Sequence, residues 1–88
     1  MYVWILNIFT RDDEFCESDA SVLAAYSEEN FEEAWEHFQR LCDANTLEED
    51  GRDDIEWKND NGYHFSSEVE TSKGYKYRYV GLKKVEVN

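Results

Sequence analysis

The sequence predicts an α+β domain, in which an antiparallel sheet of about five strands (ββαβββ) carries one amphipathic helix on one face. Three observations lead to this class: an apolar N-terminal run, a central segment with apolar residues every three or four positions, and a C-terminal third of short strand-like runs between turn residues. The chain has 88 residues and no proline or linker-like stretch. We therefore expect a single domain over residues 1–88.

The first element is a strand over residues 2–10 (YVWILNIFT), which are β-branched, aromatic or otherwise apolar at almost every position. Such a run predicts a central strand with both faces largely covered. The acidic residues 11–19 (RDDEFCESD) follow as an expected loop. Residues 21–26 (SVLAAY) are then expected to return as a strand and to complete a hairpin.

The helix is the clearest local prediction. Ser27 is a suitable N-cap, and acidic residues follow it in the first turn, where the helix dipole favours negative charge. Asn45 is the expected stop. The apolar residues step by three and four and form one stripe: Phe31, Ala34, Trp35, Phe38, Leu41 and Cys42.

Three strand-like runs fill the rest of the chain, at residues 55–58, 63–70 and 75–80. Asn61-Gly62 and Lys73-Gly74 supply the chemistry of the turns between them. Gly81 predicts a β-bulge before a last strand-like segment.

Tyrosines alternate with basic residues in the third of these runs. Interleaved aromatic and basic side chains can bind single-stranded nucleic acid. The alternative, which the acidity of the chain favours, is that Tyr75, Tyr77 and Tyr79 face the helix while Lys76 and Arg78 face solvent.

The chain is strongly and unevenly acidic. Its 21 acidic and nine basic residues give a net charge of −12, with −14 in residues 1–60 and +2 in residues 61–88. Binding of phosphate groups requires a cationic surface, so direct binding to DNA, RNA or an anionic membrane is disfavoured and basic proteins are the expected partners. The apolar run at residues 1–9 has neither the basic start of a signal peptide nor the length of a membrane span, so we expect a cytoplasmic protein.

No motif predicts catalysis or a cofactor. The candidates are His37, His64, Cys16 and Cys42, and none lies in a recognisable nucleophile turn. Two cysteines do not make a disulfide framework, and Cys42 on the apolar side of the helix is expected to behave as a small hydrophobic residue. The sequence therefore favours a protein that is not an enzyme.

The acidic run TLEEDGRDDIEW invites a test for a calcium-binding loop. With Gly51 at the sixth position of an EF-hand, Thr46 would be the first ligand and Trp57 would replace the required glutamate at the twelfth. The two histidines and two cysteines do not have zinc-finger spacing. No metal site is predicted.

The acidic residues themselves are the candidate partner-binding surface. Beside a first cluster in residues 12–19, two clusters carry this prediction: Glu28, Glu29, Glu32, Glu33 and Glu36 in the helix, and Glu48, Glu49, Asp50, Asp53, Asp54 and Glu56 after it. The helix glutamates span nine residues, about 12 Å of helix axis, or roughly one charge per 3 Å. DNA presents one phosphate per about 3.4 Å along each strand. A solvated face is the plain alternative, although the net charge exceeds the value of about 2–8 that solubility needs.

The stretches SEENFEEAWEHF and TLEEDGRDDIEW, in a short acidic chain without catalytic residues, carry a resemblance in overall character. The chain resembles small proteins of phages and mobile elements of the anti-CRISPR and anti-restriction type, several of which imitate DNA. The resemblance implies an inhibitor of a host defence nuclease, such as a CRISPR-Cas effector. It implies action in the host cytoplasm and names no target.

Two other classes of function remain open on the sequence. One is an interaction or regulatory module, homodimeric in one version, that uses a sheet edge or an aromatic patch of Trp57, Tyr63 and Phe65. The other is a small enzyme that uses His37 or His64. The leading expectation is a non-enzymatic acidic inhibitor that mimics nucleic acid.

Overall fold

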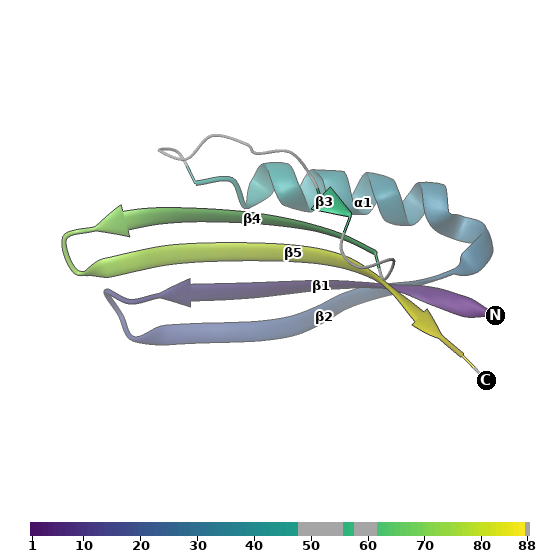
Figure 1. Ribbon diagram of the computed structural model, residues 1–88, viewed down its shortest axis with the longest axis horizontal. Coiled ribbons are helices and arrows are strands. Elements are labelled where there is room, and N and C mark those ends of the chain that lie inside the picture. The colour runs from purple at the N-terminus through teal and green to yellow at the C-terminus, as the bar shows by residue number, and fades with distance from the viewer. Residues whose placement is uncertain (48–55, 58–61, 88) are drawn as a thin grey trace.

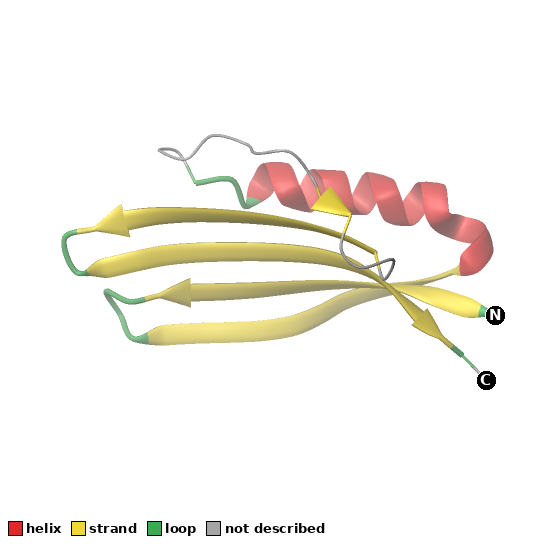
Figure 2. Cartoon of the chain, in the orientation of Figure 1, coloured by secondary structure: helices red, strands yellow, loops and turns green. Residues whose placement is uncertain are grey.

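The computed structural model describes residues 1–47, 56–57 and 62–87, with only the backbone of the pair 56–57 described. Its elements in chain order are β1 (Tyr2–Asp12), β2 (Glu17–Ser27), a 3-10 turn η1 (Glu28–Asn30), α1 (Phe31–Ala44), β3 (Glu56–Trp57), β4 (Gly62–Thr71) and β5 (Gly74–Glu86). Four long strands form an antiparallel sheet with one helix against it (Figure 1; Figure 2). The predicted α+β class is confirmed.

The expected arrangement of five strands is not matched in detail. The hydrogen-bonded order is β2-β1-β5-β4-β3, but β3 consists of two residues that pair with His64 and Tyr63 at the edge of the sheet. The turn η1 separates β2 from α1, and β1 and β2 are longer than predicted because the loop between them shrinks to a tight turn at residues 13–16. No bulge interrupts the pairing of β5 at Gly81.

The core lies between α1 and one face of the sheet. Its buried residues come from α1 and from all the long strands except β2: Trp4, Leu6, Ala34, Phe38, Cys42, Phe65, Val80 and Leu82. Phe31, Trp35 and Leu41 are half-buried against this cluster, so the predicted helical stripe is confirmed. Full burial of each large apolar side chain of this cluster stabilises the fold by about 1.5–3 kcal/mol.

The start of the helix differs from the prediction, and its end agrees with it. Ser27 makes no side-chain cap, and α1 begins at Phe31, after the 3-10 turn. At the other end the Asn45 backbone N–H donates to the Leu41 and Cys42 carbonyls, and the Asn45 side chain donates to the Leu41 carbonyl at 2.8 Å. Because these bonds satisfy carbonyls that a helix end leaves open, Asn45 stops the helix as predicted.

The other face of the sheet, which we call the open face, is not covered by any helix or strand of the described residues (Figure 1). Successive side chains of a strand point to opposite faces, and Leu6 and Val80 lie in the core. Phe9, Tyr77 and Tyr79 therefore lie on the open face. The prediction that β1 is covered on both faces is wrong for the described residues, in which β1 is an interior strand with the helix against one face.

A register shift between Leu6 and Asn7 changes the faces of β2. Leu6 pairs with Ala24 while Asn7 pairs with Val22, which leaves Leu23 as an extra residue. Ala24 is therefore on the helix side, whereas Val22 is on the open face and 66% exposed. The β-bulge thus divides β2 into two halves of opposite alternation.

No helix in the described part of the chain is both long enough and apolar enough to cross a bilayer.

Candidate functional site

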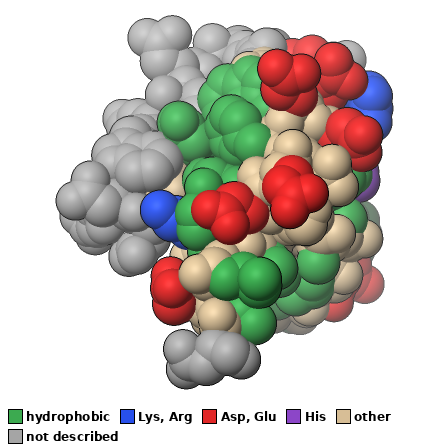
Figure 3. Space-filling view, turned by 90° about the vertical axis from the view of Figure 1, so that its right-hand side faces the viewer, with side chains coloured by type: hydrophobic (Ala, Val, Ile, Leu, Met, Phe, Trp, Pro, Cys, Tyr) green, Lys and Arg blue, Asp and Glu red, His purple; other side chains and the backbone are tan. Residues whose placement is uncertain are grey.

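The first candidate site is the helix acidic surface, which we define as Glu28, Glu29, Glu32, Glu33 and Glu36. All five side chains are exposed, and none forms an ion pair with a described residue. Figure 3 looks at the end of the molecule where α1 begins and shows acidic side chains among hydrophobic and uncharged ones. The predicted exposure of this cluster is confirmed.

These glutamates lie near one another along η1 and α1. Glu29 and Glu33, like Glu32 and Glu36, are four residues apart, a spacing that places like charges side by side on a helix and costs about 0.2–0.5 kcal/mol per pair. With a rise of about 2.0 Å per residue in η1 and 1.5 Å in α1, the five charges extend over about 13.5 Å. That is about 3.4 Å per charge, similar to the axial spacing of phosphates along one DNA strand.

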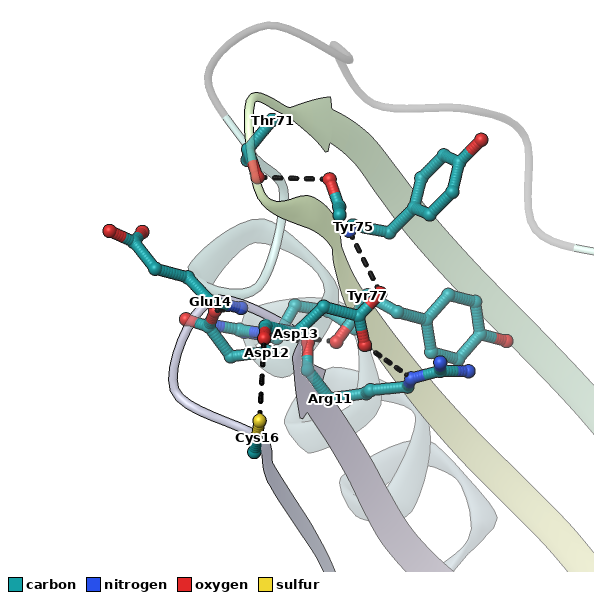
Figure 4. A network of polar contacts seen from close by, with 10 residues as sticks. Arg11, Asp12, Asp13, Glu14, Cys16, Thr71, Tyr75 and Tyr77 are labelled. Atoms are coloured by element: carbon teal, nitrogen blue, oxygen red, sulfur yellow. Dashed lines mark hydrogen bonds and ion pairs between the residues drawn. The ribbon is translucent and has the colours of Figure 1, made fainter.

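A second group of acids lies at the tip of the β1–β2 hairpin: Asp12, Asp13, Glu14, Glu17 and Asp19. Three of them, Asp12, Asp13 and Glu14, bond to neighbouring groups. Figure 4 shows the contacts of Asp13. Asp12 accepts a hydrogen bond from the Glu14 backbone N–H at 3.1 Å, and Glu14 Oε1 lies 3.9 Å from Lys73 Nζ. These carboxylates hold the tip together.

Asp13 is the most engaged acid of the tip. Its Oδ2 accepts the Tyr75 backbone N–H at 3.0 Å, and its Oδ1 accepts the Arg11 Nε–H at 2.8 Å. The hydrogen bond from Tyr75, followed by that from Arg11, lowers the pKa of Asp13 below its ordinary value of 3.8. Asp13 therefore has a structural role in joining two hairpins.

The two described acidic groups do not share one surface. Strand β2 connects them, and its 11 residues span about 35 Å at 3.2–3.4 Å per residue. The molecule is 46 Å long, and the groups lie toward opposite ends of it (Figure 1). Because the Debye length is about 8 Å at physiological salt, they act as separate charged patches.

The remaining predicted acids cannot be placed on either patch. Glu48, Glu49, Asp50, Asp53 and Asp54 lie outside the described residues. Glu56 is described by its backbone alone, which pairs with His64.

The tyrosines of β5 form a different site from the one predicted. Tyr75, Tyr77 and Tyr79 were expected to face the helix, but they lie on the open face, because Val80 and Leu82 of the same uninterrupted strand point into the core. Lys76 and Arg78 are accordingly on the helix side of the sheet. The aromatic and basic side chains of this strand are thus on opposite faces.

A groove of about 570 Å³ runs over the open face beside the edge strand. Its walls come from three neighbouring strands: Asn7 and Phe9 from β1, Ala20 and Val22 from β2, and Tyr77 and Tyr79 from β5. The rings of Phe9 and Tyr77 lie 6.0 Å apart between centroids. The groove is a mainly apolar surface with hydroxyl and amide groups at its wall.

Tyr79 packs against two residues of the neighbouring backbone and strand, Gly81 and His64. It stacks on His64 with centroids 6.0 Å apart and planes 17° apart. Its ring crosses Gly81, where an added β-carbon would lie 3.0 Å from the Tyr79 hydroxyl. Burial, with a smaller effect of Tyr77, raises the pKa of Tyr79 above its ordinary value of 10.0.

The aromatic patch predicted from the sequence is not an exposed surface. Phe65 is 1% exposed and belongs to the core, and Tyr63 packs on the helix side with its ring 4.8 Å from that of Trp35. The side chain of Trp57 lies outside the described residues. Tyr63 and Phe65 face inward because they alternate with His64 and Ser66, which lie on the open face.

The histidines and cysteines have separate surroundings. His37 Nδ1 lies 2.7 Å from the Tyr26 hydroxyl, which connects α1 to β2. His64 stacks on Tyr79 on the other face of the sheet. Cys42 is buried in the core as predicted, whereas Cys16 is exposed at the hairpin tip.

Among residues 1–47, 56–57 and 62–87, no three His, Cys, Asp or Glu side chains are grouped so that they could hold a metal ion. Most of the tested calcium-binding segment, residues 48–55, lies outside that part of the chain.

Comparison of the chain with protein-family models, curated proteins and solved structures gave no match. Two surfaces of the described residues have the chemistry to bind a partner, the helix acidic surface and the open face.

Proposed function

We propose that the protein is a non-enzymatic inhibitor that binds a basic nucleic-acid-binding protein through its helix acidic surface. The exposure of five glutamates without an ion-pair partner among the described residues carries this proposal. Their mutual repulsion works against the free fold, and a cationic partner would relieve it. The axial spacing of about 3.4 Å per charge suits a groove that normally holds phosphates.

The proposed target is a CRISPR-Cas effector or another defence nuclease, in the cytoplasm of a host cell. The resemblance to anti-CRISPR and anti-restriction proteins supports this class of target. The acids at residues 48–54 and Glu56 would extend the surface and displace further phosphates. The net charge of −12 disfavours direct binding to nucleic acid.

The test begins with affinity purification of partners from host lysate, followed by binding measurements with the purified partner. We expect the dissociation constant to rise at least tenfold between about 50 and 200 mM salt, and double-stranded DNA to compete. Binding that is insensitive to both salt and DNA would reject the proposal.

Two double variants separate a local acidic surface from net charge. Glu32→Lys with Glu36→Lys changes the charge by the same amount as Glu17→Lys with Asp19→Lys, and all four side chains are exposed. The first pair should weaken binding at least tenfold, and the second less than twofold, because it lies about 35 Å away along β2. Equal losses would indicate attraction by net charge alone.

A second candidate function is a protein-interaction module that uses the sheet. The groove of about 570 Å³ on the open face favours it, since apolar surface beside an edge strand is typical of binding sites. The surface differs from the aromatic patch expected from the sequence.

A further inference from the structure

Strand β2 is an edge of the sheet, and its outer side meets no other strand in the described part of the chain. It is 11 residues long, and nine of its residues are exposed. Its unpaired N–H and C=O groups can therefore accept a further strand. The sequence of β2 contains neither proline nor lysine, the residues that commonly protect such edges.

The charges around this edge select its partner. Residues 20–27 (ASVLAAYS) are uncharged, while Glu17 and Asp19 precede them and Glu28 and Glu29 follow. No lysine or arginine occurs between Arg11 and Arg40. The edge thus has an uncharged centre with carboxylates at both ends.

A second copy of the chain fits this edge poorly. An antiparallel pair of β2 strands centred near Leu23 would pair Asp19 of one copy with Ser27 of the other, which brings Glu17 and Asp19 of each copy near the Glu28 and Glu29 that follow the strand in the other. Like charges brought close together repel each other, which disfavours this pair. A strand with an apolar centre and basic ends would instead make favourable contacts at both ends.

The groove on the open face gives this edge a place for side chains. The bulge at Leu23 turns Val22 onto the open face, where Val22 and Ala20 form the outer wall of the groove in front of Phe9. A strand added beside β2 would point alternate side chains toward the same face. Ala20 is small, so a long apolar side chain could reach past it to the Phe9 ring.

Single-stranded nucleic acid is a poorer occupant of the open face. Stacking proteins combine aromatic rings with cations along the same groove. Here Lys76 and Arg78 are on the opposite face from Tyr77 and Tyr79. The charged residues on the open-face positions of β1, β4 and β5 are balanced in sign: Arg11, Lys83, Glu68 and Glu70.

We propose that the β2 edge, with the adjoining groove, binds an extended protein segment that has an apolar centre and lysine or arginine at both ends. The segment would add to the sheet as a strand next to β2, with alternate side chains in the groove. This site shares Glu28 and Glu29 with the helix acidic surface but includes none of Glu32, Glu33 and Glu36, and it does not depend on the proposed inhibitor function.

The probe is a synthetic peptide of the length of β2, with alternating valine and threonine in the centre and two lysines at each end. We expect it to shift the amide NMR signals of residues 20–25 and to slow their hydrogen exchange. A matched peptide with glutamates at the ends, and one with prolines in the centre, should bind at least tenfold more weakly. If the proline peptide binds as well as the first, strand addition is rejected.

Variants locate the binding on the protein. Val22→Lys should weaken binding of the lysine-ended peptide at least tenfold, while Val87→Lys, the same change at another exposed valine, should change it less than twofold. Circular dichroism confirms that both variants fold. Equal effects of the two variants, or shifts confined to α1, would overturn the proposal.

Three further outcomes distinguish this inference from its rivals. The Glu32→Lys, Glu36→Lys protein should bind the lysine-ended peptide with a dissociation constant within twofold of wild type. Complete loss of binding would show that the helix acidic surface binds the peptide. That result would overturn this inference and leave the proposed inhibitor function intact. A dimer by light scattering with β2 amides already protected would make a second copy the occupant. Binding of an oligothymidylate in the groove, in place of the peptide, would also overturn the proposal.

Discussion

Asp13 and Tyr75 form two hydrogen bonds with each other across the tips of two hairpins. The Asp13 backbone N–H donates to the Tyr75 carbonyl at 3.0 Å, and the Tyr75 N–H donates to Asp13 Oδ2 at 3.0 Å. The β1–β2 and β4–β5 hairpins are thereby connected at their turns (Figure 4). One carboxylate thus joins segments that are 62 positions apart in the chain.

This pair predicts a loss of stability in acid. The pKa of Asp13 is lower in the folded protein than its ordinary value of 3.8, so its contribution is complete above that pH and is lost as the pH falls through the folded-state pKa. Wild type should therefore be more stable than Asp13→Asn at pH 7, and the difference should shrink below about pH 4. Urea unfolding across this range measures it. Asp19→Asn is the control, and a difference that is constant with pH would contradict the assignment.

Gly62 and Gly81 should differ in their tolerance of alanine. Gly62 has φ of 144°, and a β-carbon there would collide with the Leu82 carbonyl oxygen of the paired strand. Gly62→Ala should lower the free energy of unfolding by about 3 kcal/mol or more, because the backbone at Gly62 or at Leu82 must move to make room. At Gly81 the nearest atoms belong to the side chains of Asn7 and Tyr79, which can shift more easily than backbone. Gly81→Ala should therefore lower the free energy of unfolding by only about 1–2 kcal/mol. The urea midpoints of the two variants, at constant m-value, show which variant is less stable. A larger loss for Gly81→Ala than for Gly62→Ala would refute the prediction.

The helix could be predicted because its apolar residues repeat every three or four positions. With the strand-like runs on either side, this pattern also predicts the class of the fold. The stripe from Phe31 to Cys42 needs no knowledge of the sheet, and Asn45 ends it by bonds to its own last turn. The exposure of the helix glutamates followed from the same pattern. Ser27 shows the limit of local rules, since its hydroxyl accepts from the Asn30 side chain at 3.1 Å and not from the helix backbone.

The faces of the strands could not be predicted, because they depend on where the alternation is interrupted. Tyr75, Tyr77 and Tyr79 would face the helix if Gly81 were a bulge, and they face away because β5 continues through Gly81 without one. The bulge lies instead at Leu23, in a run of small and apolar residues that gives no such signal. The groove was missed for this reason. The sequence signal that could have shown the groove is the pair Val80 and Leu82. If β5 is uninterrupted, these two apolar residues face the core and the tyrosines at odd positions face away from it.

Tyr79 should ionise at a higher pH than an ordinary tyrosine. Burial of its ring, and repulsion from Tyr77, favour the neutral phenol, so its contribution to stability is complete below pH 10.0 and is lost as the pH rises through the folded-state pKa. Absorbance titration of the wild type should show a late phenolate step that is absent in Tyr79→Phe. In Tyr75→Phe, which removes a tyrosine that is 45% exposed, the late step should remain. Loss of the step in both variants would contradict the assignment.

The hydrogen bond between Tyr26 and His37 gives His37 a structural role that a double-mutant cycle can measure. The hydroxyl and Nδ1 are 2.7 Å apart in a partly buried contact, and the rings meet edge to face at 6.0 Å. Tyr26→Phe and His37→Leu should each destabilise the protein, with a coupling free energy of about 1 kcal/mol by urea unfolding. Tyr26→Phe combined with Arg40→Ala, an exposed residue of the same helix, should be additive. Additivity in the first pair would mean that the bond contributes nothing to the fold. If His37 is structural, His37→Leu should also leave partner binding unchanged at a temperature where the variant is folded, because the ring contacts Tyr26 of β2.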